Sequence, residues 1–510
     1  MKTGKTLTMG WMLLLAIGIA FFNGFLTSAL AAPKDTLIVG TEAEVQSMDP
    51  LQNWMGYSSA VSILMYDTLV RYGAHGKLLP SLATSWEKVD DLTWRFHLRK
   101  GVKFHNGYPF TAADAKFSLD RILDPKEKCR YRSRYDSWEK VIVEDDYILV
   151  VKTKRPDPSV AGWIAFFGNI VSKKWVEENG FEELKKHAMG TGPYKFVSWK
   201  RKDRLTLVAN KDHFDRVPKV NNLIIRPIPE MAARVAELEA GGVHIITKVP
   251  MFIIPQLEKN PNTHPVILDG VLANFMLMDT ALVPEFKDKR VRQAMNYAVD
   301  KETIIKGILK GMGKPLGFGA PTPFPGIDPN IKPYPYDPQK AKALLAEAGY
   351  PDGFALNVYS PSHRYLMDKE AAQAIAEQLS RIGIKPNVLV MDTGKYFQEW
   401  RANRLKGLVY IGQHLTHWDQ SACYGWINPK SPRCTIKNQE MIDLLEDMLA
   451  TMDTTARYQK AYKLQRMMHD EATQLFLYSL KAIFGASNKI KGFISHDGVM
   501  IELWAVSLEQ

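Results

Sequence analysis

Apolar and polar side chains alternate strictly between residues 94 and 99. Trp94, Phe96 and Leu98 occupy every second position, with arginine or histidine between them. A period of two is typical of a strand that has one face in the core and the other in water, so we expect a half-buried β-strand here. Further along, Thr111 precedes Asp114 by three residues, the spacing of a helix N-cap with an acid in the first turn. The pattern therefore predicts a strand, a turn and then a helix.

Short apolar runs and stretches with helical periodicity follow one another along most of the chain. We expect strands at residues 37–39, 141–152, 194–199, 205–209, 222–227, 243–246, 275–278, 354–359, 408–411 and 476–479. We expect helices at residues 229–240, 288–299, 338–349, 368–384, 440–452 and 454–471, and a strand that turns into a helix at 168–178. Because strands and helices alternate, the sequence predicts an α/β fold.

The length of the chain implies more than one core. The chain has 510 residues, whereas single hydrophobic cores stop growing at roughly 250–300 residues. We therefore expect two or more lobes, with the second beginning near residues 268–274. The hydrophobic fraction of 46% and the charged fraction of 24% are ordinary for a soluble globular protein, so composition indicates no fibrous or disordered class.

The first 31 residues have the pattern of a secretory signal peptide. Lys2 and Lys5 give a positive start, residues 11–22 form an apolar run, and Ala29-Leu-Ala31 fits the small-x-small cleavage rule. The run is shorter than the ~20 residues that a membrane span needs. We expect cleavage after Ala31 and export, to the periplasm in an organism with two membranes. Retention as a membrane anchor is the alternative.

The net charge of the chain is positive. It is +11 for the whole sequence, and it falls to +9 when the two leader lysines are removed. A basic balance raises the question of nucleic acid or an anionic membrane as a partner. However, the basic residues are interspersed with acids, as at 183–186, and the sequence has no long basic tract. We interpret the charge as solvated surface and expect no nucleic-acid partner.

Motifs of catalysis are absent from the sequence. It contains no Gly-x-Ser-x-Gly elbow, no His-Glu-x-x-His and no phosphate-binding loop, so we do not expect an enzyme. His414, His417 and Asp419 are residue types that bind divalent transition metals. On a strand, however, these side chains would not all point the same way. We favour polar residues at the rim of a loop and expect neither a metal nor a cofactor.

Five blocks of sequence together resemble one protein family. They are residues 40–50, 81–121, 190–196, 288–301 and 336–351, and the third reads Gly-Thr-Gly-Pro-Tyr-Lys-Phe. In this order they resemble the solute-binding proteins of family 5, the extracytoplasmic receptors of peptide and nickel ABC importers. The resemblance covers nearly the whole mature chain.

The resemblance implies an α/β fold with two lobes and a hinge between them. This is the large, class II form of the periplasmic-binding-protein fold, which has an extra subdomain in the first lobe. We expect lobe I to comprise residues 32–270 and 483–510, with the inserted subdomain at about 76–190. We expect lobe II to comprise residues 271–482.

The resemblance also implies residues that contact the ligand. In the family's dipeptide receptors an arginine pairs with the ligand's carboxylate, and Arg364 lies in the similar segment here. Its planar guanidinium suits bidentate binding of a carboxylate. Those receptors hold the ligand's amine with an aspartate, for which Asp419 is the nearest match, although the family's usual Gly-Trp and Asp-Pro pattern is absent. The alternative role for both residues is an exposed salt bridge. The other expected contacts are Asn53, Trp54, Tyr365 and Trp418, with Trp54 covering the core as its alternative.

Three cysteines remain in a compartment that favours disulfides. Cys423 and Cys434 are close in sequence across a proline-containing loop, and the family's dipeptide receptors are similar in having a nearby pair in that region. We therefore expect a disulfide between Cys423 and Cys434. Cys129 is then left over, as a buried thiol.

These observations predict a receptor that captures a small solute and delivers it to an ABC permease and ATPase complex. A small peptide or peptide-like molecule is the favoured ligand, and we expect a monomer. Receptors for a nickel chelate, an oligosaccharide or an opine are alternatives within the family. An extracytoplasmic enzyme or chaperone on the same scaffold is the alternative from another class, because a fold does not fix a function.

Overall fold

The computed structural model describes residues 35–53, 56–321, 324–415, 418–431, 434–495 and 501–509. The expected signal peptide at 1–31 lies outside these residues. In the part of the chain that is described, no helix is both long and apolar enough to cross a membrane.

A mixed sheet of eleven strands runs through the whole molecule. The order along the sheet is β15-β14-β16-β12-β17-β11-β1-β10-β9-β8, and β13 pairs with β17 beside this path. The bounds are β1 Thr36–Thr41, β8 Tyr194–Lys200, β9 Arg204–Ala209, β10 Asn222–Pro227, β11 Ile245–Ile246, β12 Thr263–Met278, β13 Gly313–Pro315, β14 Ala355–Ser362, β15 Lys385–Asp392, β16 Leu408–His414 and β17 Gln474–Ser487. The strands expected at 194–199 and 205–209 are confirmed as β8 and β9, which pair antiparallel.

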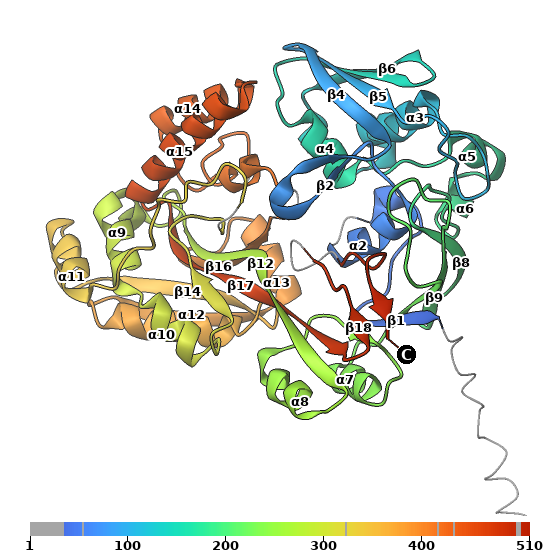
Figure 1. Ribbon diagram of the computed structural model, residues 1–510. Coiled ribbons are helices and arrows are strands. Elements are labelled where there is room, and N and C mark those ends of the chain that lie inside the picture. The colour runs from blue at the N-terminus through green and yellow to red at the C-terminus, as the bar shows by residue number, and fades with distance from the viewer. Residues whose placement is uncertain are drawn as a thin grey trace, which may run out of the picture.

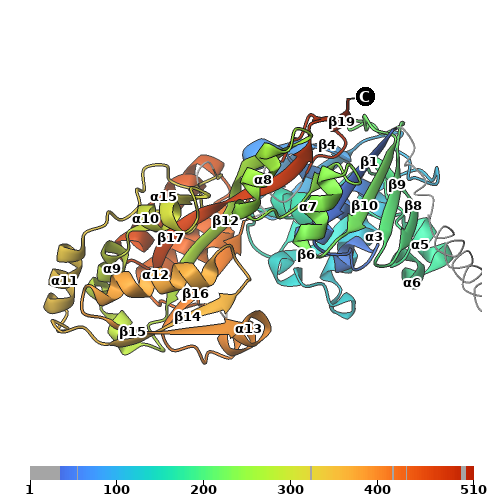
Figure 2. The same cartoon turned by 90° about the horizontal axis from the view of Figure 1, so that it is seen from below.

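Strands β12 and β17 join the two halves of the molecule. They pair antiparallel along almost their whole length, and the register shifts between Asp269 and Leu272. At one end β17 pairs with β11, and at the other β12 pairs with β16. Figures 1 and 2 show the two strands running from one half of the molecule into the other. The sequence pattern predicted only short segments of each strand.

The hydrophobic core changes where the register shifts. On β12, Leu268 packs against the first core and Leu272 against the second. On β17, Ala482 packs against the first core and Leu480 belongs to the second. The expected lobe boundaries, 270/271 and 482/483, stay a prediction, and this change of core is the observation that supports them. We use lobe I and lobe II for the two halves so divided.

A separate antiparallel sheet forms part of lobe I. Its order is β4-β5-β7-β6, and the strands are β4 Ala83–Asp90, β5 Thr93–Leu98, β6 Trp138–Asp145 and β7 Ile148–Thr153. The strand predicted from alternation at 94–99 is confirmed as β5. Helix α3 (Ala112–Leu123) packs beside β6, and Thr111 and Asp114 form the capping box at its start. The expected cap is therefore confirmed.

The remaining elements of lobe I surround these two sheets. A small hairpin consists of β2 (Val70–Tyr72) and β3 (Leu78–Pro80), and the strands β18 (Ile490–Lys491) and β19 (Ser507–Leu508) pair near the end of the chain. The helices are α2 Gly56–Met65, α4 Val160–Phe167, α5 Lys173–Asn179, α6 Phe181–Leu184, α7 Met231–Glu239 and α8 Ile254–Lys259. The helix expected within 168–178 is present as α5, but residues 168–172 form no strand. The sequence pattern gave no prediction for α4, whose uniformly apolar sequence has no clear helical period.

Helices cover the part of the sheet that belongs to lobe II (Figure 1). They are α9 Lys289–Ala298, α10 Lys301–Gly307, α11 Pro338–Glu347, α12 Asp368–Ser380, α13 Thr393–Arg401, α14 Gln439–Ala450 and α15 Thr454–Asp470. The helices predicted at 288–299, 338–349, 368–384, 440–452 and 454–471 are confirmed with ends shifted by a few residues. Local signals explain this success: for example, Asp337 caps α11 by accepting a hydrogen bond from the Lys340 N–H.

The three cysteines are free in the structure, so the disulfide expected between Cys423 and Cys434 is not formed. Cys423 is buried in a hydrophobic core of lobe II, in the short 3₁₀ helix η7 (Gln420–Tyr424). Cys434 is only half-buried, and its Sγ donates to the Ile436 carbonyl oxygen at 3.4 Å. The two thiols thus have different surroundings, which sequence proximity alone does not reveal.

We predict that the buried ion pair of Asp49 and Arg121 is essential to lobe I. Arg121 Nη2 lies 2.7 Å from Asp49 Oδ2, and the two side chains are 7% and 1% exposed. Replacing Arg121 by Met leaves a buried carboxylate without its cation, which costs ~3–5 kcal/mol. Urea unfolding should show a clearly lower midpoint. The matched control is Arg95→Met on the surface of β5, which should leave the midpoint almost unchanged. Equal midpoints for both variants would contradict the prediction.

The free cysteines generate a second prediction. Thiol counting on the denatured, unreduced mature protein should find three reactive thiols, because no pair is bonded in the structure. A count of one would show that the bridge between Cys423 and Cys434 exists after all.

Candidate ligand-binding cavity at the meeting of the lobes

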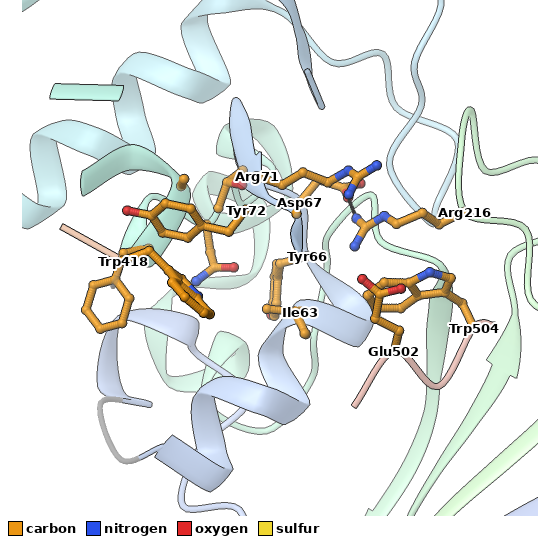
Figure 3. Close-up of a pocket in the computed structure, with 14 residues that line it drawn as sticks. Ile63, Tyr66, Asp67, Arg71, Tyr72, Arg216, Trp418, Glu502 and Trp504 are labelled. Carbon is orange, nitrogen blue, oxygen red and sulfur yellow. Dashed lines mark hydrogen bonds and ion pairs between the residues drawn. The ribbon is translucent and has the colours of Figure 1, made fainter. Parts of the chain in front are cut away.

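A cavity of ≈ 90 Å³ lies where lobe I meets Trp418 of lobe II. Aromatic side chains form much of its wall: Tyr66, Tyr72, Phe166, Trp418 and Trp504. Its polar lining consists of Asp67, Thr68, Arg71, Asn169, Arg216 and Glu502. In Figure 3, Trp418 and Tyr72 stand at one end, Glu502 and Trp504 at the other, and Arg71, Asp67 and Arg216 meet along one edge.

Asp67 anchors this edge of the cavity. Its carboxylate accepts from Thr191 Oγ1 at 2.8 Å and from His213 Nε2 at 3.2 Å, and it also pairs with Arg216. His213 Nδ1 accepts the backbone N–H groups of residues 215 and 216, which leaves the Nε2 proton for Asp67. Burial alone would raise the pKa of Asp67, but the Arg216 charge and these hydrogen bonds hold that pKa well below its usual value. Asp67 therefore stays ionised and fixes the Arg216 guanidinium.

Trp418 is the part of lobe II that reaches the cavity. It is only 7% exposed, and its ring stacks on Phe324 at a centroid distance of 5.2 Å. Its backbone has φ of +43°, in the left-handed region that non-glycine residues rarely adopt. The segment approaches Gly76 of lobe I so closely that a Cβ there would lie 2.6 Å from Trp418 Cβ. Only glycine fits at position 76, which brings the lobes into direct contact.

Asp419 is engaged within the protein. Arg457 Nη2 lies 3.1 Å from its Oδ1, and Ser159 Oγ donates to its Oδ2 at 3.1 Å. Ser159 belongs to lobe I, whereas Arg457 is on α15 of lobe II. The same carboxylate caps η7 by accepting the Ser421 N–H. The structure thus places Asp419 in a polar contact between the lobes, beside Trp418 but not in the lining of the cavity.

Arg364 is exposed at the end of β14, and its guanidinium carbon lies 5.4 Å from the centre of the Tyr365 ring. Its backbone N–H and that of Tyr365 donate to Asp368, which rigidifies the turn. Tyr365 itself is buried, and its hydroxyl donates to the Gly412 carbonyl. Of this pair, only Arg364 is therefore accessible to a solute.

Positive charge from both lobes acts on His414, at the end of β16. The pKa of His414 is lowered to about 4, chiefly by desolvation and secondarily by the positive charges of Arg364 from lobe II and Lys248 from lobe I. His414 as a residue is exposed. It is neutral at pH 7, and the charges around it favour an anionic group of a ligand.

The other expected site residues have different positions. Asn53 is buried, and its Nδ2 donates to the Ser47 carbonyl and to Ser62 Oγ. Trp54 and His417 lie outside the described residues. Among the residues that the structure describes, no cluster of three or more His, Cys, Asp or Glu side chains could hold a metal ion.

The sequence analysis missed most of the cavity. Its lining comes from α2, β2, α4, the connection of β9 to β10, the chain end and the segment after β16. No local motif marks these positions, since each lies in an ordinary strand end or loop. Only the neighbourhood of Trp418, expected as a ligand contact, pointed to this part of the molecule.

Comparisons with known proteins place the chain in one family. The model of the bacterial extracellular solute-binding proteins, family 5 (middle region), matches residues 77–427. The glutathione-binding protein GsiB of Pectobacterium atrosepticum is 29% identical over 94% of this chain and 95% of its own length. GsiB of Escherichia coli K12 is 28% identical over 94% and 95%.

A solved structure has the same fold. The ABC transporter-associated periplasmic binding protein DppA of Helicobacter pylori, in complex with the peptide STSA, is 28% identical with a TM-score of 0.77, over 93% of this chain and 98% of its own. These relatives are binding proteins rather than enzymes. The α/β fold with two lobes is that of periplasmic binding proteins, and the chain belongs to the bacterial extracellular solute-binding proteins of family 5.

Proposed function

We propose that the protein is the receptor of an ABC importer and captures a small peptide or peptide-like solute between its lobes. The observation that carries this proposal is the cavity at the meeting of the lobes, whose wall combines side chains of lobe I with Trp418 of lobe II. A solute held there contacts both lobes at once. The names of GsiB and the peptide bound to DppA support a peptide-like ligand.

The joining strands explain how capture would be signalled. β12 and β17 are the strands on which the two cores meet, and their register shift lies at the change of core. Bending there moves one lobe relative to the other, which is a hinge motion. A solute that contacts both lobes binds the closed form better and so shifts the equilibrium toward it. A permease and ATPase complex would then distinguish the loaded receptor from the empty one.

Arg364 is our proposed anchor for a carboxylate of the ligand. It is accessible, it lies on a turn held by Asp368, and together with Lys248 it makes the surroundings of His414 positive. Asp419 is less suited to hold the ligand's amine, because an amine would have to compete with Arg457 for the same carboxylate. We therefore base the proposal on Arg364.

Export to the periplasm and the absence of catalysis belong to the same proposal. The pattern of residues 1–31 supports export, and the binding-protein relatives support a role without chemistry. We expect the receptor to act as a monomer and to need no cofactor.

The anchor role predicts a large loss of affinity in Arg364→Ala. Closure desolvates the ligand carboxylate, and leaving it unpaired costs ~3 kcal/mol, or roughly a hundredfold in Kd. Calorimetry with a series of di- to tetrapeptides on protein freed of bound solute should show this loss. The control is Arg381→Ala, which removes an exposed arginine paired with Glu377 and should leave Kd unchanged. Affinities of both variants within threefold of wild type would exclude Arg364 as the anchor. No binding of any peptide would exclude the peptide class.

Export has its own test. N-terminal sequencing of protein from the periplasmic fraction should begin at Ala32 or within a residue or two of it. Protein that keeps Met1 and stays with the membrane would show a retained anchor.

A further inference from the structure

The turn that carries Arg364 has a strained backbone. It spans residues 363–367, between the end of β14 and the start of α12. His363 and Met367, at its two ends, have φ of +60° and +53°, in the left-handed region that residues with side chains rarely adopt. Such residues persist only where the surrounding structure over-determines the backbone, and they cluster at ligand clamps. This inference rests on the proposed function, in which Arg364 anchors a ligand carboxylate, and asks what holds the arginine in place.

The buried carboxylate of Asp368 holds this backbone. Its Oδ2 accepts the N–H of Arg364 at 2.8 Å and the N–H of Tyr365 at 2.9 Å. Its Oδ1 accepts the N–H of His363 at 3.2 Å. Hydrogen bonds to a carboxylate are stronger than those between neutral groups. One side chain thus fixes three consecutive peptide groups, which sets the direction in which the Arg364 side chain leaves the backbone.

The ring of Tyr365 is the surface over which the guanidinium lies. The guanidinium carbon of Arg364 is 5.4 Å from the ring centre, within the ~6 Å of a cation–π contact. The ring is buried, and its hydroxyl donates to the Gly412 carbonyl oxygen at 3.1 Å. A Cβ at position 412 would lie 2.5 Å from Tyr365 Cε1, so the ring reaches this position only because residue 412 is glycine. The ring is therefore a fixed surface.

An aromatic ring suits this role better than an acid does. A carboxylate beside Arg364 would occupy the N–H groups that a ligand carboxylate needs. The face of a ring attracts the cation and leaves those N–H groups available. Packing keeps the ring in place from the other side, because Tyr365 belongs to the hydrophobic core of lobe II and its ring centre lies 5.9 Å from that of Tyr410.

We propose that Tyr365 and Asp368 are positioning residues for Arg364. Asp368 fixes the backbone from which the arginine extends, and Tyr365 fixes the guanidinium over its ring. Both side chains are buried, so they act on the solute through the arginine. The consequence is preorganisation: an arginine that had to be ordered on binding would bind a carboxylate roughly two- to twelvefold more weakly.

A peptide and its C-terminal amide test the inference on the full mature protein, freed of bound solute by unfolding and refolding. The peptide is the one among di- to tetrapeptides that binds most tightly in calorimetry, and its amide lacks the charge that Arg364 would hold. The ratio of the two Kd values is the carboxylate preference, which Arg364→Ala should abolish. Tyr365→Leu and Asp368→Asn should each lower this preference roughly fivefold, while the Kd of the amide stays within about twofold of wild type.

Matched controls separate positioning from a general loss of structure. Tyr365→Phe keeps the ring and should retain most of the carboxylate preference. Asp392→Asn changes an acid that caps α13 in the same lobe by accepting the N–H groups of residues 394 and 395, and it should leave the preference unchanged. In a protein that already carries Arg364→Ala, Tyr365→Leu should alter neither Kd, because residues that act through one group are not additive.

The outcomes separate this inference from the proposed function. If Arg364→Ala abolishes the carboxylate preference but Tyr365→Leu and Asp368→Asn keep it, the inference is overturned and the anchor stands. Equal weakening of peptide and amide by these two variants would show a merely structural role and would also overturn it. A preference that survives Arg364→Ala would overturn both the anchor and the inference, and failure of every peptide would overturn the peptide class as well. Melting curves show which variants fold, and Asp368→Asn, which keeps the size of the side chain, decides the question where Tyr365→Leu does not fold.

Discussion

The pairing of β12 with β17 is the constraint on which the rest of the structure depends. These strands are neighbours in both halves of the main sheet. The core of lobe I gives way to the core of lobe II at the same position along both strands. Their backbone hydrogen bonds keep the halves together, because every broken bond would leave a donor and an acceptor unpaired. The ladder is interrupted at two places, between Asp269 and Leu272 and between Asn274 and Phe275, and the first of them lies where the core changes.

The lobes also touch each other directly, away from β12 and β17. Gly76 lies against Trp418, and Ser159 donates to Asp419, so lobe I touches lobe II beside the cavity. Arg457 balances the charge of Asp419 within lobe II whether or not Ser159 is near. The lobes can therefore separate without exposing an unpaired buried charge.

The sequence predicted elements that local signals determine. The capping box of Thr111 and Asp114, the cap of Asp337 and the alternation in β5 all appear in the structure, because each depends on residues close in the chain. The length of β12 and β17 escaped prediction, since their residues belong to several different hydrophobic clusters and do not keep one pattern. Asp419 could not be recognised as the partner of Arg457, thirty-eight residues away. Arg71, Asn169 and Arg216 are far apart in the sequence and line one cavity only because the chain folds. Cys423 is buried and Cys434 only half-buried, a difference that the sequence does not reveal.

The central claim is that a solute closes two lobes about β12 and β17. Small-angle X-ray scattering of the mature protein tests it directly, when the radius of gyration is measured without solute and with a saturating concentration of a peptide that calorimetry shows to bind. The account predicts a smaller radius of gyration with the peptide and no change with a peptide that does not bind. An unchanged radius of gyration at saturation would contradict the account, because the solute would then occupy a site that does not join the lobes.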